Sequence, residues 1–189
     1  TGSTASVTLT LSTGTGTLGG TATMDAVAGV ADFAGKGLNI NLVGTNKVLT
    51  ATSGVLATAT TSPAFTITAG AASTIAVNAG NGQSATAGSA VATDPSVLVT
   101  DANGNPKSGV SVTFAVASGG GSITGGTQTT DASGIATVTS WTLGTTAGAN
   151  SLTATSAGLT GSPVTFTATG TVGAAAKLAF TTQPSASTV

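Results

Sequence analysis

Histidine, cysteine, glutamate, arginine and tyrosine are all absent from this 189-residue chain. Acid–base catalysis near neutral pH usually needs histidine or a tuned carboxylate, and a serine or threonine nucleophile needs a base beside it. The carboxylates that remain are scattered and form no pair in the sequence: Asp25, Asp32, Asp94, Asp101 and Asp131. The sequence therefore predicts a protein that is not an enzyme and has no catalytic residues.

Charge is also scarce, which narrows the possible partners. Only 5% of the residues are charged and the formal net charge is −1, whereas a typical soluble domain is ~25% charged. Nucleic-acid binding relies on lysine and arginine, and zinc and transition metals prefer histidine or cysteine. The cations are four dispersed lysines: Lys36, Lys47, Lys107 and Lys177. We expect no nucleic-acid partner, no metal and no cofactor.

Long hydrophobic runs are missing although the mean hydropathy is positive. No stretch approaches the ~20 apolar residues of a membrane-spanning helix, so no membrane insertion is expected. Without cysteine the chain cannot be a small disulfide-stapled domain. Low charge combined with abundant threonine, serine, glycine and alanine favours an extracellular or cell-surface location. No signal peptide is recognisable, as expected of an internal piece of a longer protein.

The hydrophobic pattern has a period of two, which is typical of half-buried strands. In Val110–Val116 the residues Val112, Phe114 and Val116 fall on one face. Pro163–Ala168 and Leu152–Thr155 show the same alternation. Clusters such as Asp131-Ala-Ser-Gly134 separate these runs as turns. Short strands between regularly spaced turns predict an all-β fold of the sandwich type.

The sequence repeats itself at an interval of about 103 residues. Ser6–Leu9 matches Ser111–Phe114 at an offset of 105, and Gly70–Val77 matches Gly173–Phe180 at an offset of 103. This interval is normal for an immunoglobulin-like (Ig-like) domain. It predicts tandem Ig-like antiparallel β-sandwiches in three segments: 1–70, a partial domain lacking its first strands; 71–172, a complete domain; and 173–189, the first strand of a following domain or a strand donated to a neighbouring copy.

One segment carries a family resemblance. Val97–Phe114 reads Val-Leu-Val-Thr-Asp, then Gly-Asn-Pro, then Gly-Val-Ser-Val-Thr-Phe, and it resembles the bacterial Ig-like repeat domains of the invasin/intimin (group 1) type. Thr130–Val138 looks like the second signature of that family, and Ala175–Pro184 looks like the opening of repeats in very large bacterial adhesin-like proteins. The resemblance is good over 71–172 and weaker over 1–70, where Gly-Asn-Pro is missing. It implies modules that mostly act as stalks and spacers.

Asp101, Asn103 and Asn105 alternate like the first positions of a calcium loop. However, Gly104 comes too early, Pro106 stands where such a loop needs glycine, and no acidic residue closes it. The sequence favours a turn in which the Asx side chains bond the local backbone, with a weak calcium site as the alternative.

Two further features have both a binding and a structural interpretation. Trp141 could be a platform for a glycan, but a core or domain-junction tryptophan is favoured, since the chain has no second tryptophan and no tyrosine. Gly119–Gly121 resembles a phosphate loop only superficially, because it lacks the lysine and the following helix. A strand connection is expected there.

Three functions are compatible with these observations. The first is a stalk or spacer segment of a large repetitive bacterial surface protein or adhesin, stiffened because the linker Thr68–Ala72 is short. The second is a self-assembling extracellular filament, in which Lys177–Phe180 of one copy completes residues 1–70 of another by strand addition. The third is a glycan- or receptor-binding adhesin domain. The partners are accordingly neighbouring repeats of the same chain, with identical chains as partners in a filament.

The alternation also predicts which side chains form the core of the complete repeat. Burial of aliphatic and aromatic side chains should dominate its stability. The predicted core is Ile75, Val77, Val97, Val99, Val112, Phe114, Ile123, Ala136, Val138, Leu152, Ala154, Val164 and Phe166.

Overall fold

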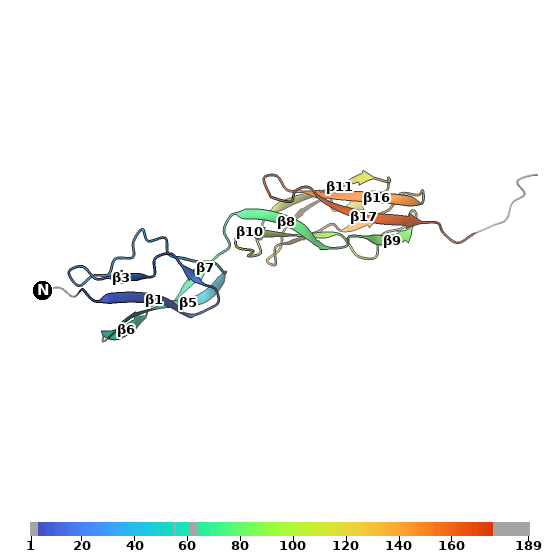
Figure 1. The fold of residues 1–189 in the computed structure, drawn as a ribbon. Helices are drawn as coiled ribbons and strands as arrows, with labels where there is room; N and C mark the ends of the chain where they lie inside the picture. The colour runs from blue at the N-terminus through green and yellow to red at the C-terminus, as the bar shows by residue number, and fades with distance from the viewer. Residues whose placement is uncertain (1–3, 55, 61–63, 176–189) are drawn as a thin grey trace, which may run out of the picture.

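The computed structural model describes residues 4–54, 56–60 and 64–175. The regular structure of these residues consists of β-strands, which confirms the all-β class. The strands form two groups that lie end to end (Figure 1). The first group comprises β1 (Ser6–Thr13), β2 (Leu18–Gly19), β3 (Thr23–Asp25), β4 (Asn39–Ile40), β5 (Gly44–Ser53), β6 (Leu56–Thr60) and β7 (Phe65–Ile67).

The second group is a two-sheet sandwich. One sheet has the order β14-β10-β8 and the other the order β13-β11-β16-β17-β9, while β12 and β15 form a separate ribbon. Pairing is antiparallel except between β17 and β9, which are parallel. The strands are β8 (Ala72–Ala79), β9 (Gln83–Thr86), β10 (Ser96–Asp101), β11 (Ser111–Ser118), β12 (Ser122–Thr124), β13 (Thr127–Thr129), β14 (Ile135–Thr137), β15 (Ser140–Thr142), β16 (Gly148–Thr155) and β17 (Val164–Thr171).

The core of the second group lies between these two sheets and follows the predicted alternation. Along β17 buried and exposed residues alternate without interruption, as a strand with one face on a core requires. Eleven of the thirteen predicted core residues are buried. Trp141 is also fully buried, which confirms its interpretation as a core residue. The predicted core omitted Val91, Leu143 and Ala168, which belong to the same core.

Two of the predicted core residues were placed wrongly. Val77 is 41% exposed, because it lies on the edge strand β8 opposite the bulge between Ser96 and Val97, where residues 76–78 are all exposed. Ile123 is only partly buried and packs against the core from the short ribbon of β12 and β15. Both residues lie outside the central strands of the two sheets: Val77 is on an edge strand and Ile123 is in the separate two-stranded ribbon.

The first group repeats half of this architecture. Its main sheet has the order β3-β1-β5-β6, with β7 also paired to β5. Leu9 pairs with Ala51 and Leu11 with Leu49 before a bulge, and Phe114 pairs with Ala154 and Val116 with Leu152 before the equivalent bulge. The offsets of 105 and 103 seen in the sequence therefore correspond to the same strand pairing in space.

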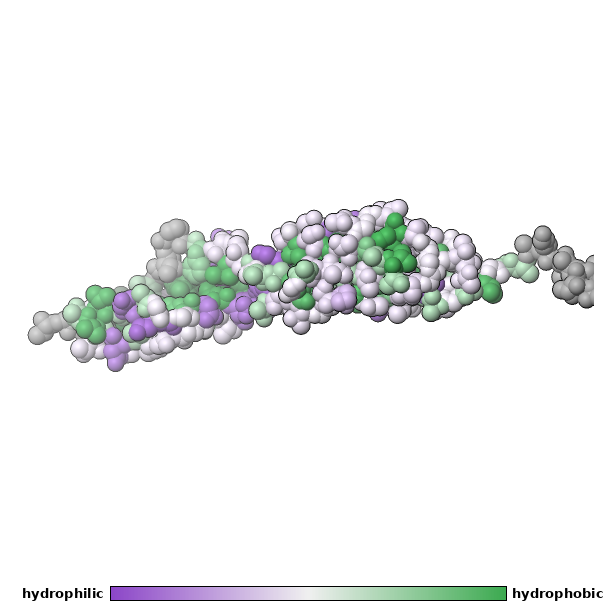
Figure 2. All heavy atoms as spheres, turned by 90° about the horizontal axis from the view of Figure 1, so that it is seen from above, coloured by the Kyte–Doolittle hydropathy of each residue, from purple (hydrophilic) through white to green (hydrophobic). Residues whose placement is uncertain are grey.

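The first group has much less buried apolar surface than the second. Ala26 is its only buried hydrophobic residue among those described, whereas Val27 is 78%, Val30 66% and Leu56 56% exposed. Apolar residues reach the surface of this group in the space-filling view (Figure 2). A single sheet with an apolar face is marginal until a second layer covers it.

Gly134 offers a test of the turn between Asp131 and β14. Its φ is +74°, and a Cβ at this position would lie 2.6 Å from the carbonyl oxygen of Val99. We expect Gly134→Ala to lower the free energy of unfolding by about 2 kcal/mol, through both the left-handed backbone and the clash. Gly82→Ala is the matched control, since Gly82 has φ +72° and open space around it.

The control should cost only about 1 kcal/mol, from the backbone conformation alone. Urea unfolding of both variants measures the difference. Equal losses would mean that the backbone of β10 moves away at Val99 to make room for the added methyl group, so that the contact between Gly134 and Val99 contributes nothing to stability.

Candidate functional site

A cluster of polar side chains lies at the junction between the two groups and joins segments that are distant in sequence. β7 ends at Ile67 and β8 begins at Ala72, so four residues connect the groups. The loop that follows β10, Asp101–Pro106, packs against this connection. Its side chains bond the connection at Gly70 and the first group at Asn41 and Val43.

Asp101 is the centre of this cluster. Its carboxylate is almost completely buried, and Oδ2 accepts a hydrogen bond from the N–H of Gly70 at 2.9 Å. Oδ1 accepts from the N–H groups of Asn103 and Asn105 at 2.8 and 2.9 Å. The side-chain amide of Asn105 donates to both oxygens at 3.1 and 2.9 Å. One carboxylate thus ties its own loop to the connection at Gly70.

These hydrogen bonds lower the pKa of Asp101. The Asn105 side chain is the largest cause, followed by opposing desolvation and then by the backbone N–H groups of Gly70, Asn105 and Asn103, and together they bring the pKa to about 2. Donors aimed at a carboxylate stabilise its charged form. Asp101 is therefore ionised at neutral pH, and its charge strengthens each hydrogen bond that it accepts.

Asn105 extends the cluster into the first group. Its Nδ2 donates to the carbonyl oxygen of Asn41 at 2.9 Å, and its Oδ1 accepts from the N–H of Val43 at 3.1 Å. Asn105 is buried, and its bonds to Asn41 and Val43 are partly buried. The amide therefore acts as a two-way clamp between a loop of the first group and Asp101 of the second.

Two lysines reinforce the junction. Lys107 donates from Nζ to the carbonyl oxygen of Ala69 at 3.2 Å, so both Ala69 and Gly70 are held by the second group. Lys47 is fully buried in the first group and donates to the carbonyl oxygen of Thr15. The side chain of Asn41 in turn accepts from the N–H of Thr17 at 2.8 Å. Hydrogen bonds within the first group therefore hold the loop that contacts Asn105 in place.

The turn predicted at Asp101, Asn103 and Asn105 is confirmed. The side chain of Asp101 bonds the backbone of the residues two and four positions later, as an Asx turn does. Both of its oxygens already accept from N–H donors, which favours the turn over the calcium alternative. No group of three or more acidic, histidine or cysteine side chains that could hold a metal occurs among the described residues.

The role of Asn105 at the junction was not predicted from the sequence. The Gly-Asn-Pro motif signalled a turn, but nothing in its pattern indicates that the asparagine faces the preceding repeat. The available signal was the combination of a short linker with an asparagine in a loop at the same end of the repeat. Val43 and Asn41, which Asn105 contacts, precede it by 62 and 64 positions in the sequence.

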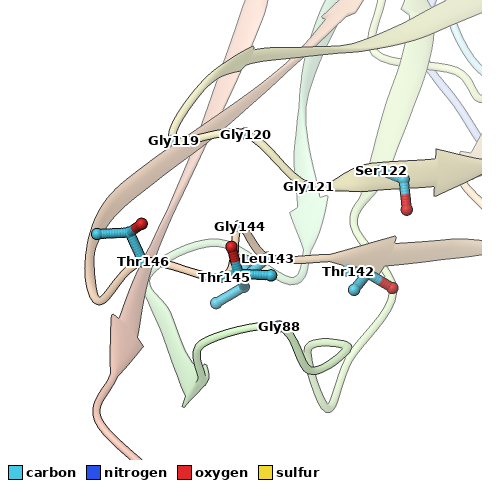
Figure 3. A pocket seen from close by; sticks show the side chains of 10 residues that line it. All are labelled: Gly88, Gly119, Gly120, Gly121, Ser122, Thr142, Leu143, Gly144, Thr145 and Thr146. Atoms are coloured by element: carbon cyan, nitrogen blue, oxygen red, sulfur yellow. The ribbon is translucent and has the colours of Figure 1, made fainter.

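The other two features singled out from the sequence have different environments. Trp141 is fully buried, so its ring cannot stack on a glycan. Its Nε1 has no hydrogen-bond partner among the described residues. Gly119–Gly121 connects β11 to β12 with three positive φ values, and it lines a hollow at the far end of the second group (Figure 3). The described residues contain no helix with the length and hydropathy that a membrane crossing requires.

The ionisation of Asp101 predicts how the second group responds to acid. Because its folded pKa is lowered from 3.8 to about 2, its stabilisation is complete above the higher value and is lost as the pH falls toward the lower one. We expect the free energy of unfolding to fall by at most about 2 kcal/mol over that interval. Urea unfolding at each pH measures this decline. Asp101→Asn should show none of this component, and an identical decline in that variant would contradict the assignment.

A scan of protein-family models matches no family, and a search of curated proteins finds no match. Solved structures do resemble the chain. The D0–D1 domains of intimin align over 88% of this chain and 79% of their own, with 20% identity and a TM-score of 0.37. The adhesin InvE of Yersinia pseudotuberculosis aligns over 91% and 50%, with 20% identity and a TM-score of 0.41.

A glycosyl hydrolase family 2 member from Bacteroides cellulosilyticus also aligns, over 86% of this chain but 22% of its own, with 17% identity and a TM-score of 0.43. Intimin is among the proteins whose repeats the segment 97–114 resembles. Similarity at this level concerns the course of the backbone and says nothing of ligands or activity.

Proposed function

We propose that the chain is a structural segment of a large repetitive bacterial surface protein, in which tandem Ig-like repeats form a stalk or spacer. The observation that carries this proposal is the junction at Asp101 and Asn105. A four-residue connection bonded at Ala69 and Gly70, with the preceding repeat bonded at Asn41 and Val43, opposes rotation of one repeat against the next. Stiff junctions are what a spacer needs and a flexible linker lacks.

In this proposal the repeats divide near residues 70 and 172. Residues 1–70 are part of one repeat, 71–172 are a whole repeat, and 173–189 open the next. The scarcity of titratable side chains fits a scaffold that performs no chemistry, and the low charge with abundant threonine and serine fits an extracellular or cell-surface location. The partners are then the neighbouring repeats of the same chain.

The stiffness of the junction can be measured directly because the chain has no cysteine. Thr10→Cys in β1 and Thr165→Cys in β17 introduce two exposed labelling sites, and pulsed electron spin resonance gives the distribution of distances between them. A stalk segment should give one narrow distribution. The control carries Gly-Ser-Gly-Ser inserted between Thr68 and Ala69, which should broaden it. Equal widths in the two chains would contradict a spacer role.

A filament built by strand addition is the second candidate. It is favoured by the exposed apolar side chains of the first group and by a hollow of about 120 Å³ lined by Leu18, Leu38, Ile40, Phe65 and their neighbours. The segment Lys177–Phe180, which would supply the added strand, lies outside the described residues. Electron microscopy of the protein isolated from its source separates the candidates. Regular filaments would favour strand addition, and single thin rods without end-to-end order would favour the stalk.

A glycan- or receptor-binding adhesin domain is less well supported. Sites of this kind usually present exposed aromatic side chains or a charged cluster. Trp141 is buried, and the exposed large hydrophobic residues in the part of the chain that the structure describes are aliphatic.

A further inference from the structure

The end of the second group that faces away from the junction carries a hollow of about 480 Å³ (Figure 3). It is lined by the bend Gly119–Gly121, by residues 142–146 and by Gly88. The corresponding end of the first group is the one that contacts Asn105 of the second group. This contact indicates which partner the hollow of the second group could bind.

The correspondence follows from the strand register. The offset of 105 that relates β1 to β11 takes Gly14 to Gly119, and the offset of 103 that relates β5 to β16 takes Lys47 to Asn150. Both glycines pack against the corresponding side chain: a Cβ on Gly14 would lie 2.9 Å from Cγ of Lys47, and one on Gly119 would lie 2.5 Å from Oδ1 of Asn150. The two ends therefore share these loops, whereas Gly88, which also lines the hollow of the second group, has no equivalent in residues 1–70.

In the first group these loops hold Asn105 of the second. The contacts are the carbonyl oxygen of Asn41 and the N–H of Val43, which the offset of 103 takes to Gly144 and Thr146. Thr146 is exposed, and its N–H donates to no acceptor in the described part of the chain. The carbonyl oxygen of Gly144 accepts from Gly88 at 2.9 Å and keeps a second lone pair. The donor that an asparagine amide needs is therefore exposed and free, and the acceptor is present, although Gly144 is buried beside Gly88.

The segment leaving this end also repeats the first junction. Thr171-Val-Gly-Ala-Ala175 corresponds to Thr68-Ala-Gly-Ala-Ala72, so Gly173 takes the place of Gly70, whose N–H binds Asp101. Val172 is 81% exposed, whereas its equivalent Ala69 is partly covered at the occupied junction. An exposed valine at the end of the second group that carries the hollow is the kind of surface that a neighbouring repeat would cover.

We infer that the hollow at Gly119–Gly121 and Thr146 is a socket for the Asp101–Pro106 loop of a further copy of the repeat, following in tandem. The incoming asparagine donates to the carbonyl oxygen of Gly144 and accepts from the N–H of Thr146, while the incoming aspartate accepts from the N–H of Gly173. Each repeat thus presents a loop at one end and a socket at the other, so the same contact can be used at successive junctions. This inference rests on the tandem arrangement proposed above and names the surface that mediates it.

The test uses the full chain extended after residue 189 by a second copy of residues 87–172, which completes a further repeat begun at 173. Hydrogen exchange of the Thr146 amide, followed by NMR, is compared in the original and extended chains. We expect exchange about tenfold slower in the extended chain. A variant of the extended chain with Asn105→Ala in the added copy alone should restore the faster rate, while Asn103→Ala in that copy should not.

Unchanged exchange at Thr146 in an extended chain whose added repeat is folded, as shown by slow exchange in its own core strands, would overturn the inference. The amide of Val43 in the same spectra separates this failure from that of the proposed function. Slow exchange at Val43 with fast exchange at Thr146 would mean that the first junction is stiff and the socket is not used. Fast exchange at both would contradict the stiff spacer itself.

Discussion

A Phe114→Ala chain should unfold with a free energy about 3–5 kcal/mol below that of the unchanged chain. Phe114 is 3% exposed and belongs to the core that both sheets of the second group share. Its cross-strand partner is Ala154, whose methyl group cannot fill the space that the ring would leave. The cost therefore includes both the lost burial of the ring and the cavity that remains.

Urea unfolding followed by the fluorescence of Trp141 measures this loss, since the single tryptophan of the chain lies in the same core. Val77→Ala is the matched control on the other sheet. Val77 was predicted to be a core residue, but it is 41% exposed, so its truncation should change stability by only about 0.5 kcal/mol. A midpoint that barely moves for Phe114→Ala would mean that the observed register of β11 is wrong.

The contrast between Phe114 and Val77 shows how far alternation alone predicts the fold. In the central strands β10, β11, β16 and β17 a period of two is sufficient, because both neighbours of each strand fix which face meets the core. On the edge strand β8 the same pattern fails at Val77, since a bulge in the pairing with β10 ends the alternation. Edge positions and bulges depend on pairing, which is not written in the strand's own residues.

The internal repeat predicted more than the strand pattern did. Its two offsets match the observed pairing of Leu9 with Ala51 and of Phe114 with Ala154, and the difference between them is absorbed in the loops between the strands. The candidate site was predicted only in part. The turn at Asp101 follows from local Asx chemistry, whereas the contact of Asn105 with Asn41 depends on how two repeats meet.

Truncating Asn105 should therefore have effects at the junction that no single repeat would reveal. Asn105→Ala removes the side-chain bonds to Asn41, Val43 and Asp101 together. The carbonyl oxygen of Asn41 and the N–H of Val43 lose this partner at a partly buried junction, while Asp101 keeps its backbone donors. We expect the free energy of unfolding to fall by about 2–4 kcal/mol, and the distance distribution between labels at positions 10 and 165 to broaden toward that of the Gly-Ser insertion.

Asn103→Ala is the control for this change. Asn103 lies in the same loop, its side chain is exposed, and only its backbone N–H binds Asp101, which alanine retains. This variant should keep the narrow distribution and nearly all of the stability. Equal behaviour of the two variants would mean that the short connection alone orients the repeats.

The acid response gives a second, independent readout of the same change. The Asn105 side chain is the main cause that lowers the pKa of Asp101, so its removal should bring that pKa back toward 3.8. Asp101 then contributes less to stability at neutral pH, and the decline in acid becomes smaller and lies at higher pH. An unchanged acid response in Asn105→Ala would mean that the amide of Asn105 does not lower the pKa of Asp101. A shifted acid response together with a broadened distance distribution would therefore trace the stiffness of the junction to the amide of Asn105.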